Sequence, residues 1–376
     1  MSAVKRSLNV GVVGMGKMGV SITRNLAFKA RSAMYLQLHS RTLSKARKVS
    51  EDMGVDGATC AMRLHDKYST MTKWCDIVLL TLRNVDASRH VLLEHPDAML
   101  RHARKGQIIV DHTTVDAETS RECAFEAKKR GALFLDVPMS GSPKVAFNGQ
   151  LTLMAGGDSE AFQRCLALFR MYADNIHHMG DSGSGSAAKA ISQMLVAVHN
   201  TAAAEAMKMA NVLGVEDYQK LVQVLDSSWG SSTMLRRNAP TMQDLIRNPE
   251  RVPPSSSASV EALLDDLSLL SPPAYEDGMA AARGSTVNIE DYPLLANSVR
   301  VLEAAANGGV GASDMSSVIH FLEAARASTP STSRRHNDAP AAAAALLTQS
   351  EHRAPQVVDE LPPVSSRPED NDVEFY

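Results

Sequence analysis

A glycine-rich turn near the N-terminus constrains the fold of this chain more than any other feature. Residues 8–13 form a short apolar run rich in valine, and Gly14, Gly16 and Gly19 follow it as Gly-x-Gly-x-x-Gly. An amphipathic helix is expected next, over residues 20–30. A strand, a glycine turn and a helix in this order favour dinucleotide binding, because the helix N-terminus presents free N–H groups to a pyrophosphate. The alternative is an incidental glycine turn.

The first half of the chain alternates expected strands with expected helices. This alternation predicts an α/β fold, in which a doubly wound and mostly parallel sheet is covered by helices on both faces. The expected strands are Leu8–Val13, Met34–His39, Ile77–Leu82, Gln107–Val110, Leu133–Val137, Gly149–Ala155 and Ile176–His178, with helices such as Ser44–Met53 and Asp116–Arg130 between them.

The second half of the chain is expected to be all-helical. Its first helix, Ser186–Leu213, is rich in alanine and methionine and apolar nearly all round, so we expect it to be buried between domains or subunits. Shorter helices are expected at Tyr218–Asp226, Met234–Ile246, Val260–Leu270, Tyr275–Arg283, Tyr292–Ala306 and Ser313–Ala327.

We therefore expect three parts, with boundaries at residues 1–182, 183–327 and 328–376. The first is a dinucleotide-binding domain and the second an all-α substrate and dimerisation domain. The third is expected to be a disordered tail, because it has too few apolar residues to offset the entropy of ordering. A peptide that docks on a partner is the alternative for the tail.

Composition excludes several classes of protein. With 376 residues, 44% of them hydrophobic and 22% charged, the chain has an ordinary globular composition and room for two domains. A net charge of −3 predicts no binding to nucleic acid or to an anionic membrane, and no apolar run reaches transmembrane length. The four cysteines form no Cys-x-x-Cys pair, so we expect neither a metal site nor disulfides. A cytoplasmic protein that acts on a small molecule fits these observations.

The end of the expected second strand favours NADP over NAD. An NAD enzyme carries an acidic residue about 20 positions beyond the glycine turn, which accepts a hydrogen bond from the ribose 2′-hydroxyl. This chain has Arg41, 22 residues after Gly19, with Thr42 beside it and Lys45 and Arg47 nearby. A guanidinium can bind a 2′-phosphate and stack on adenine. The alternative is a solvated basic helix start.

Polar residues follow two of the later strands. Because ligands of open parallel sheets bind at the carboxyl ends of the strands, such residues are candidates for a site. Thr113 and Thr114 could contact the nicotinamide or the substrate, or could cap the next helix. Ser140, Gly141 and Ser142 could present hydroxyl and N–H groups to a substrate carboxylate, or could form an ordinary turn.

Lys189 is a charged residue in the otherwise apolar start of the long helical run. Such a lysine either extends to solvent or has a chemical role. Burial would lower its pKa toward neutrality, which suits a proton donor to a developing alkoxide.

Taken together, these motifs resemble the β-hydroxyacid dehydrogenase family, of the 3-hydroxyisobutyrate and 6-phosphogluconate dehydrogenase type. The resemblance covers roughly residues 8–325 and implies a Rossmann domain followed by an all-α domain. It also implies NADP-dependent hydride transfer between nicotinamide and a small β-hydroxyacid or semialdehyde, in a homodimer or homotetramer. The matching segments are residues 13–19, 40–42, 111–114, 136–142, 183–189 and 312–316.

The resemblance assigns roles to single residues. Lys189 would be the general acid in reduction and the general base in oxidation. The substrate would be bound by Ser140, Gly141, Ser142, Thr113 and Gln193, and the cofactor by Gly14, Met15, Gly16, Lys17, Met18, Gly19, Arg41, Thr42, Leu82 and Thr114.

The chain departs from the family at the substrate end. The family has asparagines three and four positions beyond its lysine, where this chain has Ser192 and Gln193. The family also carries a Lys-Asp pair in its helical domain. Ungapped alignment from Tyr292 places Glu276-Asp277 there, the alternative is Asp265-Asp266, and neither pair contains a base. Two alternatives follow: an imine or carbonyl reductase with a non-carboxylate substrate, or an inactive cofactor-binding homologue that acts as an interaction protein.

Overall fold

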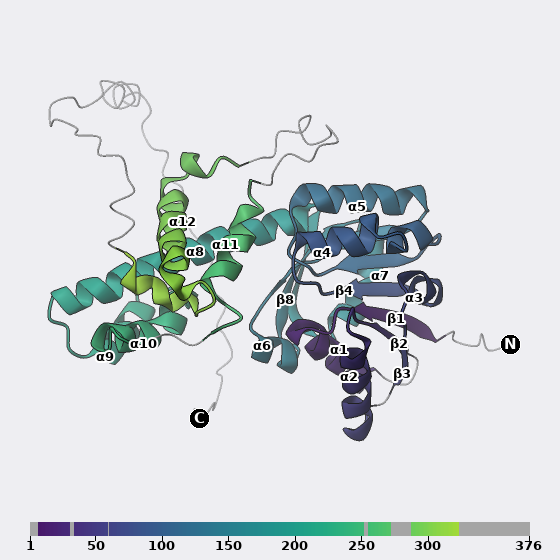
Figure 1. The fold of residues 1–376 in the computed structure, drawn as a ribbon, viewed down its shortest axis with the longest axis horizontal. Helices are drawn as coiled ribbons and strands as arrows, with labels where there is room; N and C mark the ends of the chain where they lie inside the picture. The colour runs from purple at the N-terminus through teal and green to yellow at the C-terminus, as the bar shows by residue number, and fades with distance from the viewer. Residues whose placement is uncertain (1–6, 31–33, 59, 252–254, 272–286, 323–376) are drawn as a thin grey trace, which may run out of the picture. The chain divides into compact units, whose positions relative to one another are not determined.

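The computed structural model describes residues 7–30, 34–58, 60–251, 255–271 and 287–322. Within these residues it contains a nine-stranded sheet followed by a helical region (Figure 1). The strands are β1 (Leu8–Val13), β2 (Met34–His39), β3 (Ala61–Leu64), β4 (Ile77–Leu80), β5 (Ile108–Asp111), β6 (Leu133–Asp136), β7 (Met139–Ser140), β8 (Leu151–Gly157) and β9 (Ala173–Gly180).

The sheet is parallel from β3 to β6 and has the order β3-β2-β1-β4-β5-β6-β8-β7, with β9 paired to β8. β8 pairs antiparallel with both β6 and β7, and β9 runs parallel to β8. The order turns back at β1, so a crevice for a ligand is expected where β1 and β4 end. This Rossmann-like topology confirms the doubly wound sheet predicted from the alternating pattern.

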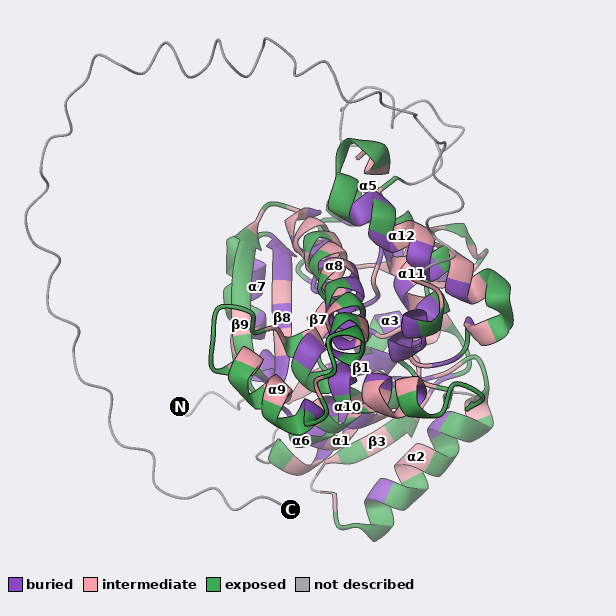
Figure 2. Ribbon diagram, turned by 90° about the vertical axis from the view of Figure 1, so that its left-hand side faces the viewer, coloured by how far each residue is buried: buried purple, intermediate pink, exposed green. Residues whose placement is uncertain are grey.

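Side chains of the central strands alternate between two buried cores. In β1, Val10 and Val12 pack on one face, whereas Val13 packs on the other. β4 alternates in the same way, with Leu79 on the first face and Leu80 on the second. Because successive strand side chains point to opposite faces, a continuous apolar run is buried on both sides. Figure 2 shows β1 buried, whereas helix α2 (Leu43–Val55) is mostly exposed.

The helices of the sheet region cover the sheet, and all of them except α4 (Val85–Arg89) contribute side chains to the two cores. They are α1 (Lys17–Lys29), α2, α3 (Tyr68–Trp74), α4, α5 (Ala117–Lys129), α6 (Pro143–Asn148) and α7 (Ser159–Phe169). The helical region contains α8 (Ser184–Val212), α9 (Tyr218–Asp226), α10 (Thr233–Arg247), α11 (Val260–Ser268), α12 (Pro293–Ala305) and the short 3₁₀ helix η6 (Met315–His320).

Several expected elements differ from the structure. The sequence pattern missed β3, because this strand is short and none of its residues is fully buried. The helix expected at 313–327 is a 3₁₀ helix over Met315–His320 in its described part, where Asp314 caps the first turn. The helix expected at 275–283 and the tail lie outside the described residues, so the three domain boundaries stay predictions. No described helix is long and apolar enough to cross a membrane.

Candidate active site

The glycine turn between β1 and α1 has the geometry of a phosphate cradle. Gly14 has a φ of 98°, and its N–H donates to His39 O at 3.0 Å, which joins the ends of β1 and β2. A Cβ atom at Gly19 would lie 1.9 Å from Gly14 O, whereas a Cβ atom at Gly16 would meet nothing within 4 Å. Two glycines are therefore required by packing, and Gly16 borders open space.

The start of α1 has free hydrogen-bond donors at this place. Gly16 is the N-cap, so no side chain caps the helix, and no acidic residue lies in the first turn. The first N–H groups of a helix need acceptors, and a phosphate supplies them. These residues fit the pyrophosphate of a dinucleotide.

Arg41 and Thr42 follow the end of β2, and both side chains are exposed. Thr42 is the N-cap of α2 but makes no capping bond with its side chain. Because Gly14 is bonded to His39, both residues lie on the edge of the sheet that carries the glycine turn. The arrangement leaves the guanidinium accessible to a ligand, and its preference for a 2′-phosphate stays a prediction.

Thr113 connects the ends of β4 and β5. Its hydroxyl accepts a hydrogen bond from Leu82 N at 3.1 Å, and its own N–H donates to Asp111 Oδ1 at 2.9 Å. Burial raises the pKa of Asp111 to about 6, although hydrogen bonds from Ser88 and Thr113 oppose the shift. The structure thus brings Leu82 and Thr113 together.

The alternative interpretation of the two threonines as a helix cap is wrong. Asp116 is the N-cap of α5, and its carboxylate accepts from Thr119 N at 2.8 Å. Thr114 is partly exposed beside the buried Thr113. Its contact with a cofactor stays a prediction.

His112 lies between Asp111 and Thr113 and is buried. The sequence pattern did not single it out. Its Nδ1 lies 2.6 Å from Val137 O, and its Nε2 lies 3.0 Å from Tyr172 Oη. Burial lowers the pKa of His112 to about 4. The neutral ring links β5 to the chain after β6 and to the turn before β9. Its polar partners come from distant segments, so the local sequence carries no signal for this role.

The segment 140–142 forms a turn between β7 and α6. Ser140 pairs with Thr152 of β8, and Gly141 has a φ of 143°. Ser142 Oγ accepts from Val145 N at 3.3 Å and so caps α6. The capping role agrees with the interpretation as a turn, while Gly141 and Ser142 also remain exposed to a ligand.

Asp136, the last residue of β6, fixes the start of α8. Its two carboxylate oxygens accept from Gly183 N at 2.8 Å and from Ser186 N at 2.9 Å. A Cβ atom at Gly185 would lie 2.3 Å from Met154 O, so the helix start packs directly on the strand backbone. Lys189 follows in the second turn, and its helix is therefore anchored to the sheet at this end.

Lys189 is buried, with 7% of its surface exposed. Its Nζ donates to Gln193 Oε1 at 3.1 Å, and Gln193 Nε2 donates to Asp266 Oδ2 on α11. Burial lowers the pKa of Lys189, and the carboxylate of Asp266 opposes this shift. Burial likewise raises the pKa of Asp266, opposed by Lys189. The alternative pair Asp265-Asp266 is thus the one seen beside the lysine, while Glu276-Asp277 lies outside the described residues.

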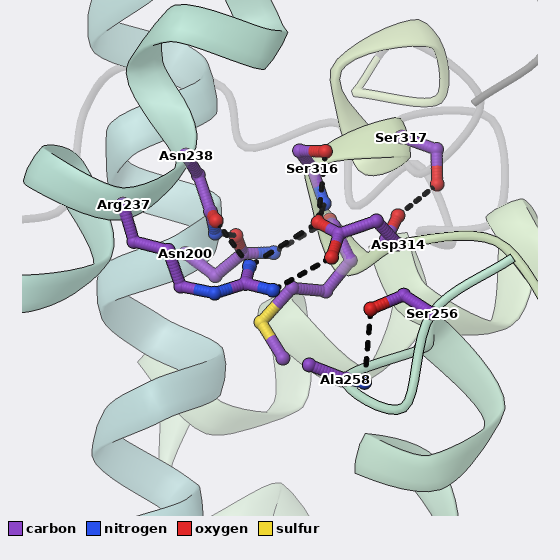
Figure 3. A network of polar contacts seen from close by, with 9 residues as sticks. Asn200, Arg237, Asn238, Ser256, Ala258, Asp314, Ser316 and Ser317 are labelled. Carbon is purple, nitrogen blue, oxygen red and sulfur yellow. Dashed lines mark hydrogen bonds and ion pairs between the residues drawn. The ribbon is translucent and has the colours of Figure 1, made fainter. Parts of the chain in front are cut away.

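A second polar network gives the C-terminal Asp-x-Ser segment a structural role (Figure 3). Asp314 forms an ion pair with Arg237 of α10 at 2.7 Å and accepts from Ser316 N at 3.1 Å. Asn200 of α8 donates to Met315 O at 3.0 Å, and Asn238 of α10 donates to Asn200 Oδ1 at 2.6 Å. These bonds hold η6 against α8 and α10.

Comparisons with known proteins agree with this architecture. The model of the NAD-binding domain of 6-phosphogluconate dehydrogenase matches residues 9–180. The model described as the NAD-binding domain of NADP-dependent 3-hydroxyisobutyrate dehydrogenase matches residues 183–322. The two matches follow one another along the chain and meet near the start of α8.

Curated relatives carry related activities. Human mitochondrial 3-hydroxyisobutyrate dehydrogenase is 28% identical over 60% of this chain and 64% of its own length. The NAD-dependent L-serine dehydrogenase of Pseudomonas aeruginosa is 28% identical over 73% of this chain and 88% of its own.

A solved structure, Mycobacterium tuberculosis 3-hydroxyisobutyrate dehydrogenase with L-serine, shares the fold. Its TM-score is 0.66 at 24% identity, over 84% of this chain and 99% of that one. The sheet order, the two consecutive family matches and these relatives lead to one conclusion. The chain belongs to the β-hydroxyacid dehydrogenase family of NAD(P)-binding oxidoreductases.

Proposed function

We propose that this protein is an NADP-dependent oxidoreductase of the 3-hydroxyisobutyrate dehydrogenase type. Its substrate would be a small β-hydroxyacid or the corresponding semialdehyde. The observation that carries the proposal is the buried Lys189 in the second turn of α8, where a charged side chain is costly unless it has a partner or a role. The named activities of the human and Pseudomonas relatives support the substrate class.

Lys189 would act as the general acid and base. The bound nicotinamide would supply or accept the hydride. In reduction, the Lys189 ammonium gives one proton to the carbonyl oxygen as negative charge develops there, and in oxidation the amine takes it back. Because burial lowers the pKa of Lys189, the proton is transferred more readily near neutral pH than from an exposed lysine.

The substrate would lie against the turn at Ser140, Gly141 and Ser142, with Thr113 and Gln193 nearby. Exposure of Gly141 and Ser142 supports this role. Thr113 lies at the carboxyl end of β5, where its hydroxyl accepts from Leu82 N and so fixes the chain beside the proposed substrate position.

The cofactor would be NADP, with NAD as the alternative. Its pyrophosphate would face the turn formed by Gly14, Met15, Gly16, Lys17, Met18 and Gly19, and its 2′-phosphate would face Arg41 and Thr42. The uncapped start of α1 and the exposure of Arg41 support this assignment. Leu82 and Thr114 would border the nicotinamide end.

A second candidate is an imine or carbonyl reductase with a substrate that lacks a carboxylate. The specific observation in its favour is the carboxylate of Asp266, which is joined to Lys189 through Gln193. In the alternative alignment the base of the family's Lys-Asp pair is replaced by Asp265. In that alignment α11 contains no lysine or arginine that could bind a substrate carboxylate beside Lys189.

A homodimer or homotetramer remains part of the proposal. Its support is a set of exposed apolar side chains on α8, which a subunit contact would cover. They are Ile191, Leu195, Met209 and Val212, each at least 45% exposed. A cytoplasmic location is also proposed, on the basis of cysteine usage.

The test is a steady-state survey with NADPH and NADH, read as the absorbance of the reduced nicotinamide. The panel pairs short semialdehyde acids with neutral ketones and cyclic imines of similar size. We expect turnover with NADPH and a semialdehyde acid to be highest. Faster turnover of the neutral compounds would replace the first candidate by the second. Tight NADPH binding without turnover of any compound would contradict both.

A further inference from the structure

We propose that Asp266 is a positioning residue, which acts through Gln193 to orient the Lys189 ammonium and to stabilise its charge. The inference rests on the proposed role of Lys189. It gives Gln193 a different task from the substrate contact that the resemblance implies. Its basis is a chain of contacts across two helices that are far apart in sequence.

The contacts begin on one face of α8. Lys189 and Gln193 are four residues apart, so their side chains lie one helical turn from each other. Lys189 Nζ donates to Gln193 Oε1 at 3.1 Å, and Gln193 Nε2 continues the chain to Asp266. One N–H of the ammonium is thereby directed along the helix, and two remain for other acceptors.

The packing of α11 presents Asp266 to this face. Leu263 and Leu267 of α11 are almost fully buried in the core that α11 shares with α8. Asp266 lies between them in sequence and is partly buried, whereas Asp265 is exposed. The apolar face of α11 therefore fixes the side of the helix from which the Asp266 carboxylate meets Gln193.

The two bonds give the Gln193 amide a single orientation. Turned over, the amide would place its NH₂ group against the ammonium and its oxygen against the carboxylate, so that donors would face donors and acceptors would face acceptors. Gln193 thus connects a cation to an anion by complementary ends. No proton has to pass through it, because its task is to orient the ammonium.

The charges of the two ends support each other. Burial of Lys189 and of Asp266 disfavours both charged forms, and each charge opposes the pKa shift of the other. Within the described residues, Asp266 is the charged group that acts on Lys189, while Asp265 acts on Asp266. Lys189 therefore keeps its proton to a higher pH than burial alone would allow.

The experiment measures the titration of Lys189 without any substrate. Full-length protein labelled at lysine Cε is titrated by NMR, and the Lys189 signal is assigned by its loss in Lys189→Met. Asp266→Asn keeps an acceptor for Gln193 but removes the charge. We expect it to lower the titration midpoint of Lys189 by about 1 pH unit, because the Asp266 charge raises the Lys189 pKa and a nearby opposite charge shifts a pKa by about one unit or more. The matched control is Asp265→Asn, one residue away and exposed, which should shift the midpoint by much less.

A second variant tests the connection itself. Gln193→Met keeps the length of the side chain but removes both bonds, so the Lys189 ammonium loses its acceptor. We expect kcat to fall by about tenfold, the value of one charge-assisted hydrogen bond, with little change in the KM for the cofactor. Thermal unfolding checks that each variant is folded.

The outcomes separate this inference from the proposed function. Equal midpoints in Asp266→Asn and Asp265→Asn would overturn the positioning role, whatever the enzyme reduces. A lowered midpoint in Asp266→Asn supports the role even if no compound in the panel is turned over, because that result would count against the proposed function alone. Unchanged kcat in a folded Gln193→Met protein would contradict the role of the amide.

Discussion

The glycine turn and the Lys189 cluster differ in how their residues are held. In the turn, the constraint is local and steric: Gly19 and Gly14 lie five positions apart and their backbones are in contact. In the cluster, Gln193 and Asp266 are 73 residues apart and meet only because α11 packs on α8. A local steric constraint can be read from spacing, whereas an electrostatic pair between distant helices cannot. Variants at the two places therefore separate the two kinds of constraint.

The largest effect is expected at Lys189. Lys189→Met removes the proton donor while keeping an apolar stem of similar length, so kcat should fall by about one hundred- to ten-thousandfold. Steady-state kinetics measure the loss, and NADPH binding by fluorescence should be unchanged. Near-normal turnover would show that the lysine takes no part in the chemistry.

Gly19→Ala should cost about 3 kcal/mol of unfolding free energy, because its Cβ atom would overlap Gly14 O. Gly16→Ala is the matched control within the same turn. It should change the unfolding free energy by less than about 0.5 kcal/mol, since open space surrounds this position. It should still weaken NADPH binding, because the added methyl group would enter the open space in which we propose that the pyrophosphate binds. Urea unfolding and NADPH titration distinguish the two, and equal destabilisation would refute the steric argument.

Arg41→Ala tests the choice of cofactor. Loss of a charge-assisted contact to the 2′-phosphate should raise the Kd of NADPH by about ten- to one hundredfold. The Kd of NADH should change by less than about threefold, because NADH has no phosphate at this place. Fluorescence titration measures the Kd of both cofactors. An equal rise in both Kd values would show that Arg41 does not bind the 2′-phosphate.

His112 and Asp111 should make opposite contributions to the pH dependence of stability. The folded-state pKa of His112 is lowered to about 4, so its contribution is present above its ordinary pKa of 6.5 and is lost as pH falls. The folded-state pKa of Asp111 is raised to about 6, so its contribution is present below its ordinary 3.8 and is lost as pH rises. The two slopes oppose each other between about pH 4 and pH 6.

His112→Gln should therefore expose the Asp111 slope. The unfolding free energy of this variant should fall as pH rises through that window, by at most about 1.4 kcal/mol per pH unit. Asp111→Asn should show the opposite slope. Urea unfolding across the window measures both, and parallel slopes in the two variants would contradict the assignment.

The smallest effect is expected in the network around η6. Asp314 caps η6 and pairs with Arg237, and its side chain is 15% exposed. Asp314→Ala should lower the unfolding free energy by about 1 to 2 kcal/mol. Asp226→Ala breaks the neighbouring pair with Arg236, which is exposed, and should leave stability unchanged. Similar losses in both variants would show that the capping and ion pairing of Asp314 contribute no more to stability than an exposed ion pair does.

Much of the first half of the fold was predictable, because buried parallel strands are continuous apolar runs between glycine turns. The expected bounds of β1 and β2 are confirmed, and those of β4 to β6 differ by one or two residues. The edge strand β3 was missed because its side chains are not buried and carry no periodic signal. The short 3₁₀ helix η6 was expected as an α-helix, since the capping bonds of Asp314 are not visible in an apolar pattern.

The candidate site likewise contains residues that the sequence singled out and residues that it did not. Residues near the glycine turn could be assigned because each lies at a strand end, where chain order predicts position. Lys189 could be singled out because a charge in the otherwise apolar start of a long helix is conspicuous in the sequence. Asp136, His112 and Asp266 received no role of their own, because their partners come from distant segments.

The sequence by itself determined the doubly wound sheet, the dinucleotide turn and the place of the lysine at the apolar start of a long helix, whereas its burial came from the structure. Spacing and apolar periodicity carry these features, and both act over a few residues. Only the tertiary structure decided which carboxylate faces Lys189, since two candidate pairs were open in the sequence. The physical reason is that a buried charge is stabilised by whatever group packing places beside it, and in this protein the packing of α11 on α8 brings Asp266 there.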